Sequence, residues 1–140
     1  MLAPYQGRVW ASQNLMIKIL VIDDDATIRG IVRTALERHG CVVAEAKDGR
    51  DGIKQIKAEP PALALIDLIM PEQEGMETIQ KLRRDFPAIK IIAISGGGQM
   101  GKDDLLYVAK KLGADGCLAK PFTTDALWSE VQKALAGKQG

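Results

Sequence analysis

Residues 63–75 read LALIDLIMPEQEG. The aliphatic run 63–66 is too short for a helix and follows two prolines, which predicts a buried strand of a parallel sheet. Asp67 ends this strand, and Pro71 and Gly75 predict a loop before the next helix. Ligands of open α/β sheets bind beyond the carboxyl ends of the strands, so Asp67 faces the region where chemistry occurs. Taken alone, an aspartate here is more typical of a turn, and a function for it requires support from the other strand ends.

The rest of the chain alternates predicted strands with predicted helices. Further strands are expected at residues 17–22, 41–46, 89–94 and 116–119. Helices are expected over residues 26–39, from 49 onward, over 75–85, from 102 or 103 to 112, and from 123 or 124 to 137. The apolar face of the first helix is expected to consist of Ile28, Ile31, Val32, Ala35 and Leu36.

This alternation with short connections predicts a parallel sheet with helices on both faces. The expected fold class is α/β, a doubly wound five-stranded parallel sheet with five helices. Such sheets most often have the flavodoxin-like strand order 2-1-3-4-5, which makes the first and third strands neighbours. A length of 140 residues fits one such domain with a well-buried core.

Composition excludes several classes of protein. With 46% apolar residues, 26% charged residues and a net charge of +1, the chain has no overall bias toward nucleic acid or membranes. Cys41 and Cys117 show no CxxC spacing, which predicts small core residues in a reducing compartment. The sequence lacks a membrane-length apolar run and a secretory signal pattern, so a cytoplasmic protein is expected. Residues 1–15 have no periodicity and are expected to be a disordered leader or extension, with the domain at 16–140.

Polar side chains follow four of the predicted strands and should meet at one edge of the sheet. They are Asp23 and Asp24, Asp67, Ser95 and Lys120. Three carboxylates from neighbouring strands cannot all stay ionised at close range without a counter-charge. Oxygen ligands without histidine or cysteine select Mg²⁺, or alternatively Mn²⁺. The sequence therefore predicts a metal-assisted phosphate site at this edge.

Four motifs resemble the receiver domain of two-component response regulators. They are ILVIDDD at the first strand end, LIDLIMPEQEG around Asp67, AIS with the glycines after it at Ser95, and LAKPF at Lys120. The resemblance extends from Ile17 to about Leu135, and four motifs in this order are highly specific. It indicates a chemotaxis-type receiver, either a single-domain protein or part of a longer one, and the length favours the first.

The resemblance also implies roles for the residues that match the motifs. These are Asp67 as phosphoacceptor, Asp23, Asp24, Asp67 and the Ile69 carbonyl as Mg²⁺ ligands, and Ser95 and Lys120 as phosphoryl-binding and switch residues. A cis peptide bond between Lys120 and Pro121 is implied as well. Such a domain catalyses only its own phosphotransfer and dephosphorylation and is not otherwise an enzyme.

Implied partners are a sensor histidine kinase or a histidine phosphotransfer protein as donor. A downstream protein or output domain would bind the surface of the fourth helix, fifth strand and fifth helix. Direct binding of nucleic acid or membrane is not expected.

Some positions depart from the family pattern or have a structural interpretation. Cys117 stands where many receivers carry an aromatic switch residue, three positions before Lys120. Ile69 flanks the expected phosphoryl group but cannot position an attacking water, which predicts slow loss of phosphate. Asp25 is expected to cap the first helix, and His39 is expected to be structural in the last turn of that helix.

Two alternatives from other functional classes fit parts of the sequence. Asp23 to Thr27 read DDDAT, which fits the DxDx[TV] motif of haloacid-dehalogenase-type phosphatases with Asp23 as nucleophile. Those enzymes place an acidic pair after the lysine, where only Asp125 and Glu130 follow here, and Asp67 would have no role. The second alternative, suggested by Cys117, is a degenerate receiver that binds proteins without being phosphorylated.

Overall fold

The computed structural model describes residues 16–70, 74–96 and 102–137. A parallel five-stranded sheet in the order β2-β1-β3-β4-β5 forms the middle layer. The strands are β1 (Lys18–Ile22), β2 (Val42–Ala46), β3 (Leu63–Asp67), β4 (Lys90–Ser95) and β5 (Gly116–Ala119). The predicted fold class and strand order are confirmed.

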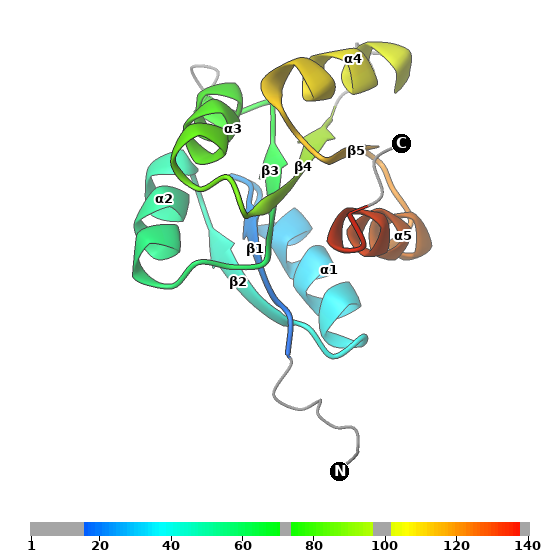
Figure 1. The fold of residues 1–140 in the computed structure, drawn as a ribbon. Coiled ribbons are helices and arrows are strands. Elements are labelled where there is room, and N and C mark those ends of the chain that lie inside the picture. Colours follow the sequence, from blue (N-terminus) through cyan, green and yellow to red (C-terminus); the bar gives the residue numbers. More distant parts are fainter. Residues whose placement is uncertain (1–15, 71–73, 97–101, 138–140) are drawn as a thin grey trace.

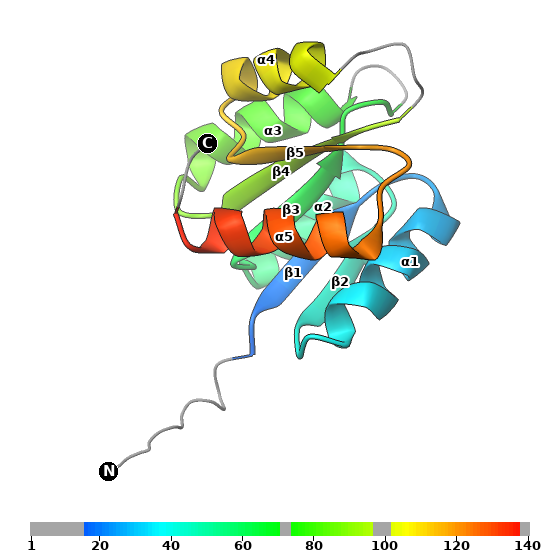
Figure 2. The same cartoon turned by 90° about the vertical axis from the view of Figure 1, so that its right-hand side faces the viewer.

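Five helices cover the two faces of the sheet (Figure 1). They are α1 (Ala26–Glu37), α2 (Gly49–Ala58), α3 (Glu74–Asp85), α4 (Lys102–Leu112) and α5 (Thr124–Leu135). Helices α1 and α5 pack on one face, and α2, α3 and α4 pack on the other (Figures 1 and 2). Each face has its own apolar core, which explains why β3, at the centre, is buried at all five of its residues.

Strand register positions the polar side chains at the sheet edge. Ile22 of β1 lies beside Ile66 of β3, so the next residues, Asp23 and Asp67, emerge side by side. Ser95 pairs with Ala119, which puts Lys120 just beyond the end of β4. The carboxyl ends of β1, β3, β4 and β5 therefore meet at one edge of the sheet.

Helix α1 differs from the prediction in two details. It ends at Glu37, because the backbone turns at Gly40 with a φ of 85°, so His39 lies beyond the helix. The His39 ring stacks on Trp128 of α5 with ring centroids 4.0 Å apart, which is a structural role of a kind the sequence did not specify. Ile31 was predicted to be buried but is 46% exposed, since it lies at the margin of the apolar face. The predicted cap is confirmed: the Asp25 side chain accepts a hydrogen bond from the Thr27 amide.

Other predictions have mixed outcomes. The Lys120–Pro121 peptide bond is cis, as predicted. Cys41 is buried as expected, whereas Cys117 is only partly buried, and both are unpaired. No helix in the described ranges is long and apolar enough to span a membrane. The predicted leader 1–15 lies outside the described residues, and so do residues 97–101 of the glycine-rich loop predicted at 96–101.

Candidate functional site

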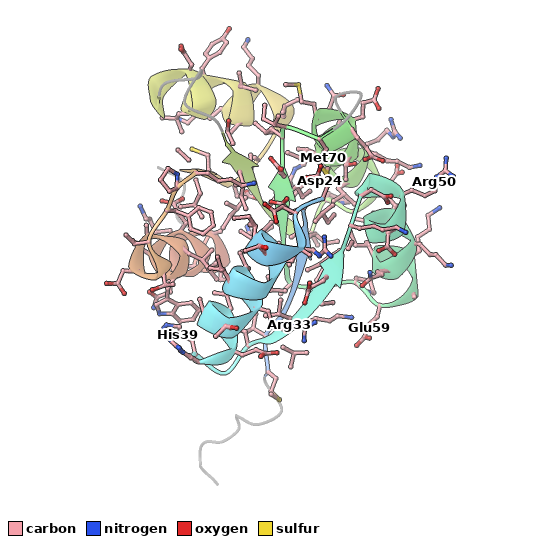
Figure 3. The ribbon with its side chains drawn as sticks, turned by 180° about the vertical axis from the view of Figure 1, so that it is seen from behind. Asp24, Arg33, His39, Arg50, Glu59 and Met70 are labelled. Atoms are coloured by element: carbon pink, nitrogen blue, oxygen red, sulfur yellow. The ribbon has the colours of Figure 1, made fainter. Side chains whose placement is uncertain are left out.

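Three carboxylates gather beyond the ends of β1 and β3. One oxygen from each of Asp23, Asp24 and Asp67 lies within 4.8 Å of the others. Asp23 and Asp67 are 0% and 2% exposed, whereas Asp24 is exposed at the sheet edge (Figure 3). Adjacent strands in matched register produce this cluster, and the sequence had predicted it from the strand order.

Lys120 supplies a positive charge to the two buried acids. Its Nζ lies 3.0 Å from Oδ2 of Asp23 and 3.4 Å from Oδ2 of Asp67. The Lys120 amide donates a hydrogen bond of 2.7 Å to the Ser95 backbone oxygen, which ties β5 to the end of β4. A Cβ on Gly96 would come within 3.1 Å of Cδ of Lys120, so a glycine there makes room for the lysine stem. The sequence predicted that a metal ion supplies the counter-charge for these acids. The structure shows that Lys120 supplies part of it.

Burial and neighbouring charges shift the pKa values at this site. Burial raises the pKa of Asp67, and the Asp23 carboxylate adds to this effect. The Ile69 amide, which donates to Oδ1 of Asp67 at 3.0 Å, and Lys120 act in the opposite direction without cancelling it. Burial lowers the pKa of Lys120, but its contacts with Asp23 and Asp67 outweigh burial and raise it. Lys120 therefore stays protonated. The ionised form of Asp67 is less stable in the folded protein than it would be in water.

Replacing Asp67 with asparagine is expected to stabilise the metal-free protein at pH 7. Because its folded pKa is raised, Asp67 favours folding fully only below its ordinary pKa and loses this contribution as pH rises through the raised value. Asp67→Asn should raise the midpoint of thermal unfolding by a few degrees in a chelator at pH 7. The difference should shrink toward pH ~4, where the carboxyl group of the wild type is protonated. The exposed Asp104→Asn variant is the control, and an Asp67→Asn variant less stable than the wild type contradicts the prediction.

Two of the other predicted residues, Ser95 and Ile69, lie at the same edge, whereas Cys117 lies within β5. Ser95 is buried at the end of β4, and Ile69 lies in the turn after Asp67 with its side chain 56% exposed. Cys117 is partly buried and lines a cavity of about 650 Å³ between α4, β5 and α5. No aromatic ring stands at that position to link the edge with this surface.

An arginine network that sequence reasoning missed holds the turn carrying Asp23. Nη1 of Arg29 donates to the backbone oxygen of Asp23 at 2.7 Å, and its Nε donates to Oε1 of Glu45 at 3.0 Å. Arg33 donates to the other oxygen of Glu45 at 2.7 Å. Burial would raise the pKa of Glu45, but hydrogen bonds from Arg33 and Arg29 lower it. The sequence gives little indication of this pairing, because Arg29 belongs to α1 and Glu45 to β2.

The donor set suits a hard divalent cation. Oδ2 of Asp23 is buried and accepts no hydrogen bond within the described residues, although it pairs electrostatically with Lys120. Oδ1 of the same residue is occupied by the Asp25 amide at 2.9 Å. The cluster offers only oxygen ligands, among them Oδ2 of Asp23 and the exposed Asp24 carboxylate. Such a set fits Mg²⁺ or Mn²⁺ better than a soft metal.

Comparison with known proteins identifies the family. The family model of the response regulator receiver domain matches residues 19–132. The chain belongs to this family. A receiver domain is a signalling module, and the match favours it over the phosphatase alternative. That alternative left Asp67 without a role, whereas Asp67 lies within the acidic cluster.

Two curated relatives of this receiver domain differ in length. Chemotaxis protein CheY of Listeria monocytogenes is 31% identical over 120 residues, which are 85% of this chain and 98% of that protein. The probable transcriptional regulator ycf27 of Porphyridium aerugineum is 37% identical over 120 residues, 84% of this chain but 48% of that protein. The chain thus spans about half of the ycf27 protein and nearly all of the CheY protein.

Solved structures agree with the receiver fold. The CheY-like receiver domain protein from Methanospirillum hungatei JF-1 matches with a TM-score of 0.78 and 28% identity, covering 88% of this chain and 96% of that one. A response regulator from Thermotoga maritima matches with a TM-score of 0.77 and 27% identity, covering 87% and 99%.

Proposed function

We propose that this receiver domain accepts a phosphoryl group on Asp67 in a Mg²⁺-dependent reaction and thereby changes its binding to a partner. The observation that carries the proposal is the cluster of three carboxylates at the carboxyl edge, two of which, Asp23 and Asp67, contact Nζ of Lys120. The donor would be a phosphohistidine on a sensor histidine kinase or a histidine phosphotransfer protein. Comparison of phosphoryl uptake between the wild type and Asp67→Asn tests it, whereas the degenerate-receiver alternative predicts no uptake by either.

The chemistry follows from the charges at the edge. A carboxylate oxygen of Asp67 attacks the phosphorus in line, the phosphorus–nitrogen bond of the donor breaks, and an acyl phosphate forms. Asp23, Asp24, Asp67 and the Ile69 carbonyl would hold the cation, which neutralises phosphoryl oxygens when bound. Lys120 donates to those same oxygens, where a loose transition state carries its charge. Burial raises the pKa of Asp67, so a bound cation would favour the ionised form that acts as the nucleophile.

The output of the switch would pass through Ser95. Its hydroxyl group, at the end of β4, would turn to donate to the new phosphoryl oxygen and draw the following loop inward. A downstream protein or output domain would bind the surface of α4, β5 and α5, where the cavity beside Cys117 and Phe122 lies. Because Cys117 replaces the usual ring, this surface would respond without an aromatic relay.

Slow loss of phosphate is the expected consequence of Ile69. Its exposed side chain follows Asp67 by two residues and offers no hydrogen bond to an attacking water. Ile69→Asn should therefore shorten the half-life of the aspartyl phosphate several-fold in Mg²⁺, measured by intact mass over time. Ile69→Val keeps the site apolar and should match the wild type. A wild type that loses phosphate as fast as Ile69→Asn would show that Ile69 has no such effect.

Arg29 is expected to position the metal-binding turn through its bond to the Asp23 carbonyl. Arg29→Gln should weaken Mg²⁺ binding about tenfold in a calorimetric titration, as is typical when a group that orients a ligand is removed. Arg29→Lys should recover only part of the affinity, since lysine lacks the fork that reaches both Asp23 and Glu45. Arg33→Gln is a matched control, because Arg33 contacts Glu45 but not Asp23. Equal losses in Arg33→Gln and Arg29→Gln would assign the effect to general stability.

A further inference from the structure

Helices α2 and α3 lie side by side on one face of the sheet (Figure 1). Side chains of both helices line an open groove between them. Its volume is about 490 Å³, and its floor includes Gly49, Ile53 and Thr78. A Cβ on Gly49 would collide with Oγ1 of Thr78, so the glycine allows the two helices to approach closely at this end. The Thr78 hydroxyl group donates a hydrogen bond of 2.7 Å to the Glu74 backbone oxygen. Its proton is therefore not available to an occupant of the groove.

Basic side chains dominate the walls of this groove. Arg50, Lys54 and Lys57 follow one another at helical spacing on α2, and Lys81 faces them from α3. Figure 3 shows Arg50 extending outward from α2. None of these four cations has an ion pair among the described residues, whereas Lys18, Arg83 and Lys133 on other surfaces do. Four unpaired cations in one groove contrast with a net charge of +1 for the whole chain.

The charges are also ordered along the groove. Glu74 and Glu77 come from the first half of α3, nearest the carboxyl edge of the sheet, and Arg50, from the first turn of α2, is the one cation of the four at this end. Lys54, Lys57 and Lys81 come from the second halves of the two helices and meet no acid there. An occupant therefore needs negative charge at the far end, over Lys54, Lys57 and Lys81. A polyanion of uniform charge, such as a nucleic acid, would be repelled at the near end by the two glutamates.

We propose that the α2–α3 groove docks a short acidic segment of a partner protein. Carboxylates of the segment pair with Lys54, Lys57 and Lys81, and an apolar side chain packs on Ile53. Helix α2 has 10 residues and is about 15 Å long, so a helical segment of similar length, or about five extended residues, fills the groove. This surface is separate from the face of α4, β5 and α5 and from the acidic cluster, and binding to it does not require phosphorylation.

The test measures binding of a fluorescein-labelled peptide of about ten residues, rich in Glu and Asp with one central Leu, to the unphosphorylated full chain. Fluorescence anisotropy should show saturable binding that weakens with salt. The variant Lys54→Glu/Lys57→Glu/Lys81→Glu should bind at least tenfold more weakly. The control Lys110→Glu/Lys111→Glu/Lys133→Glu changes the net charge equally on other helices and should bind like the wild type. The milder Lys54→Gln/Lys57→Gln/Lys81→Gln variant should fall between them, and circular dichroism checks that all variants fold.

Backbone amide shifts locate the peptide independently of the variants. Addition of the peptide should move the signals of Gly49, Ile53 and Thr78 more than those of α5. Absence of binding, equal weakening in both charge-reversed variants, or shifts centred elsewhere would overturn the proposal. So would tighter groove-dependent binding of a DNA duplex or of vesicles containing phosphatidylserine, which would assign the groove to another class of partner. Phosphoryl uptake by the charge-reversed variant is measured separately, so failure here is distinguishable from failure of the proposed phosphoacceptor function.

Discussion

Asp67→Asn is expected to abolish phosphoryl uptake completely. In the wild type, incubation with acetyl phosphate and Mg²⁺ should add one phosphoryl group, detected by intact mass. The asparagine side chain keeps the shape of the aspartate and an acceptor for the Ile69 amide, but its amide cannot act as a carboxylate nucleophile. Burial and the Asp23 charge raise the pKa of Asp67, so converting this carboxylate to an ester removes an unfavourable buried charge.

The controls for this prediction separate the nucleophile from its neighbours. Asp125→Asn removes an exposed carboxylate at the start of α5 and should leave uptake unchanged. A chelator should suppress uptake in the wild type, because the carboxylate cluster then lacks the cation that draws the phosphoryl group. Undiminished uptake by Asp67→Asn would exclude Asp67 as the acceptor. A wild type without uptake, and without any response to beryllofluoride in Mg²⁺, would instead support the degenerate-receiver alternative.

Gly75→Ala is expected to destabilise the protein by about 2–3 kcal/mol or more. A Cβ at this position would collide with the backbone oxygen of Asp67 and lie 2.8 Å from Cα of Leu68. Both neighbours are backbone atoms at the end of the central strand, so no side chain can rotate away. Helix α3 would have to move off the strand, with loss of its buried contacts. Urea unfolding should show the loss of stability as a lower midpoint.

Gly30→Ala is the matched control for this glycine. Gly30 lies within α1, and a Cβ there would meet nothing within 4 Å. The same substitution should therefore stabilise the protein by about 0.5–1 kcal/mol through helix propensity alone. If Gly75→Ala were as stable as the wild type, the close approach of α3 to Asp67 would not be a constraint on the fold.

Local sequence patterns predicted most of the fold and the composition of the site. The aliphatic run 63–66 marked the central strand, and acids or polar residues after the strands marked its functional edge. The predictions that were wrong or incomplete concern residues whose environment is set by contacts with other elements and not by the local sequence. Ile31 fits the apolar period of α1 but lies at the margin of the contact with the sheet, so it is exposed. His39 has no sequence partner that indicates its stacking on Trp128.

The sequence by itself determined the order of strands and helices, the acids at positions 23, 24 and 67, and the motifs of a receiver domain. These features depend on side-chain periodicity and on residues within one turn or strand of each other. The sequence predicted that Lys120 and Asp67 share one edge, but only the tertiary structure decided that Nζ of Lys120 contacts the Asp67 carboxylate, 53 residues away. Only the tertiary structure, too, decided that Arg29 holds the Asp23 turn and that Gly75 lets α3 pack against the strand end. Each of these contacts requires the pairing of distant strands and the packing of helices against them. The physical reason is that charge interactions and steric contacts act over a few ångströms in space, whatever the separation along the chain.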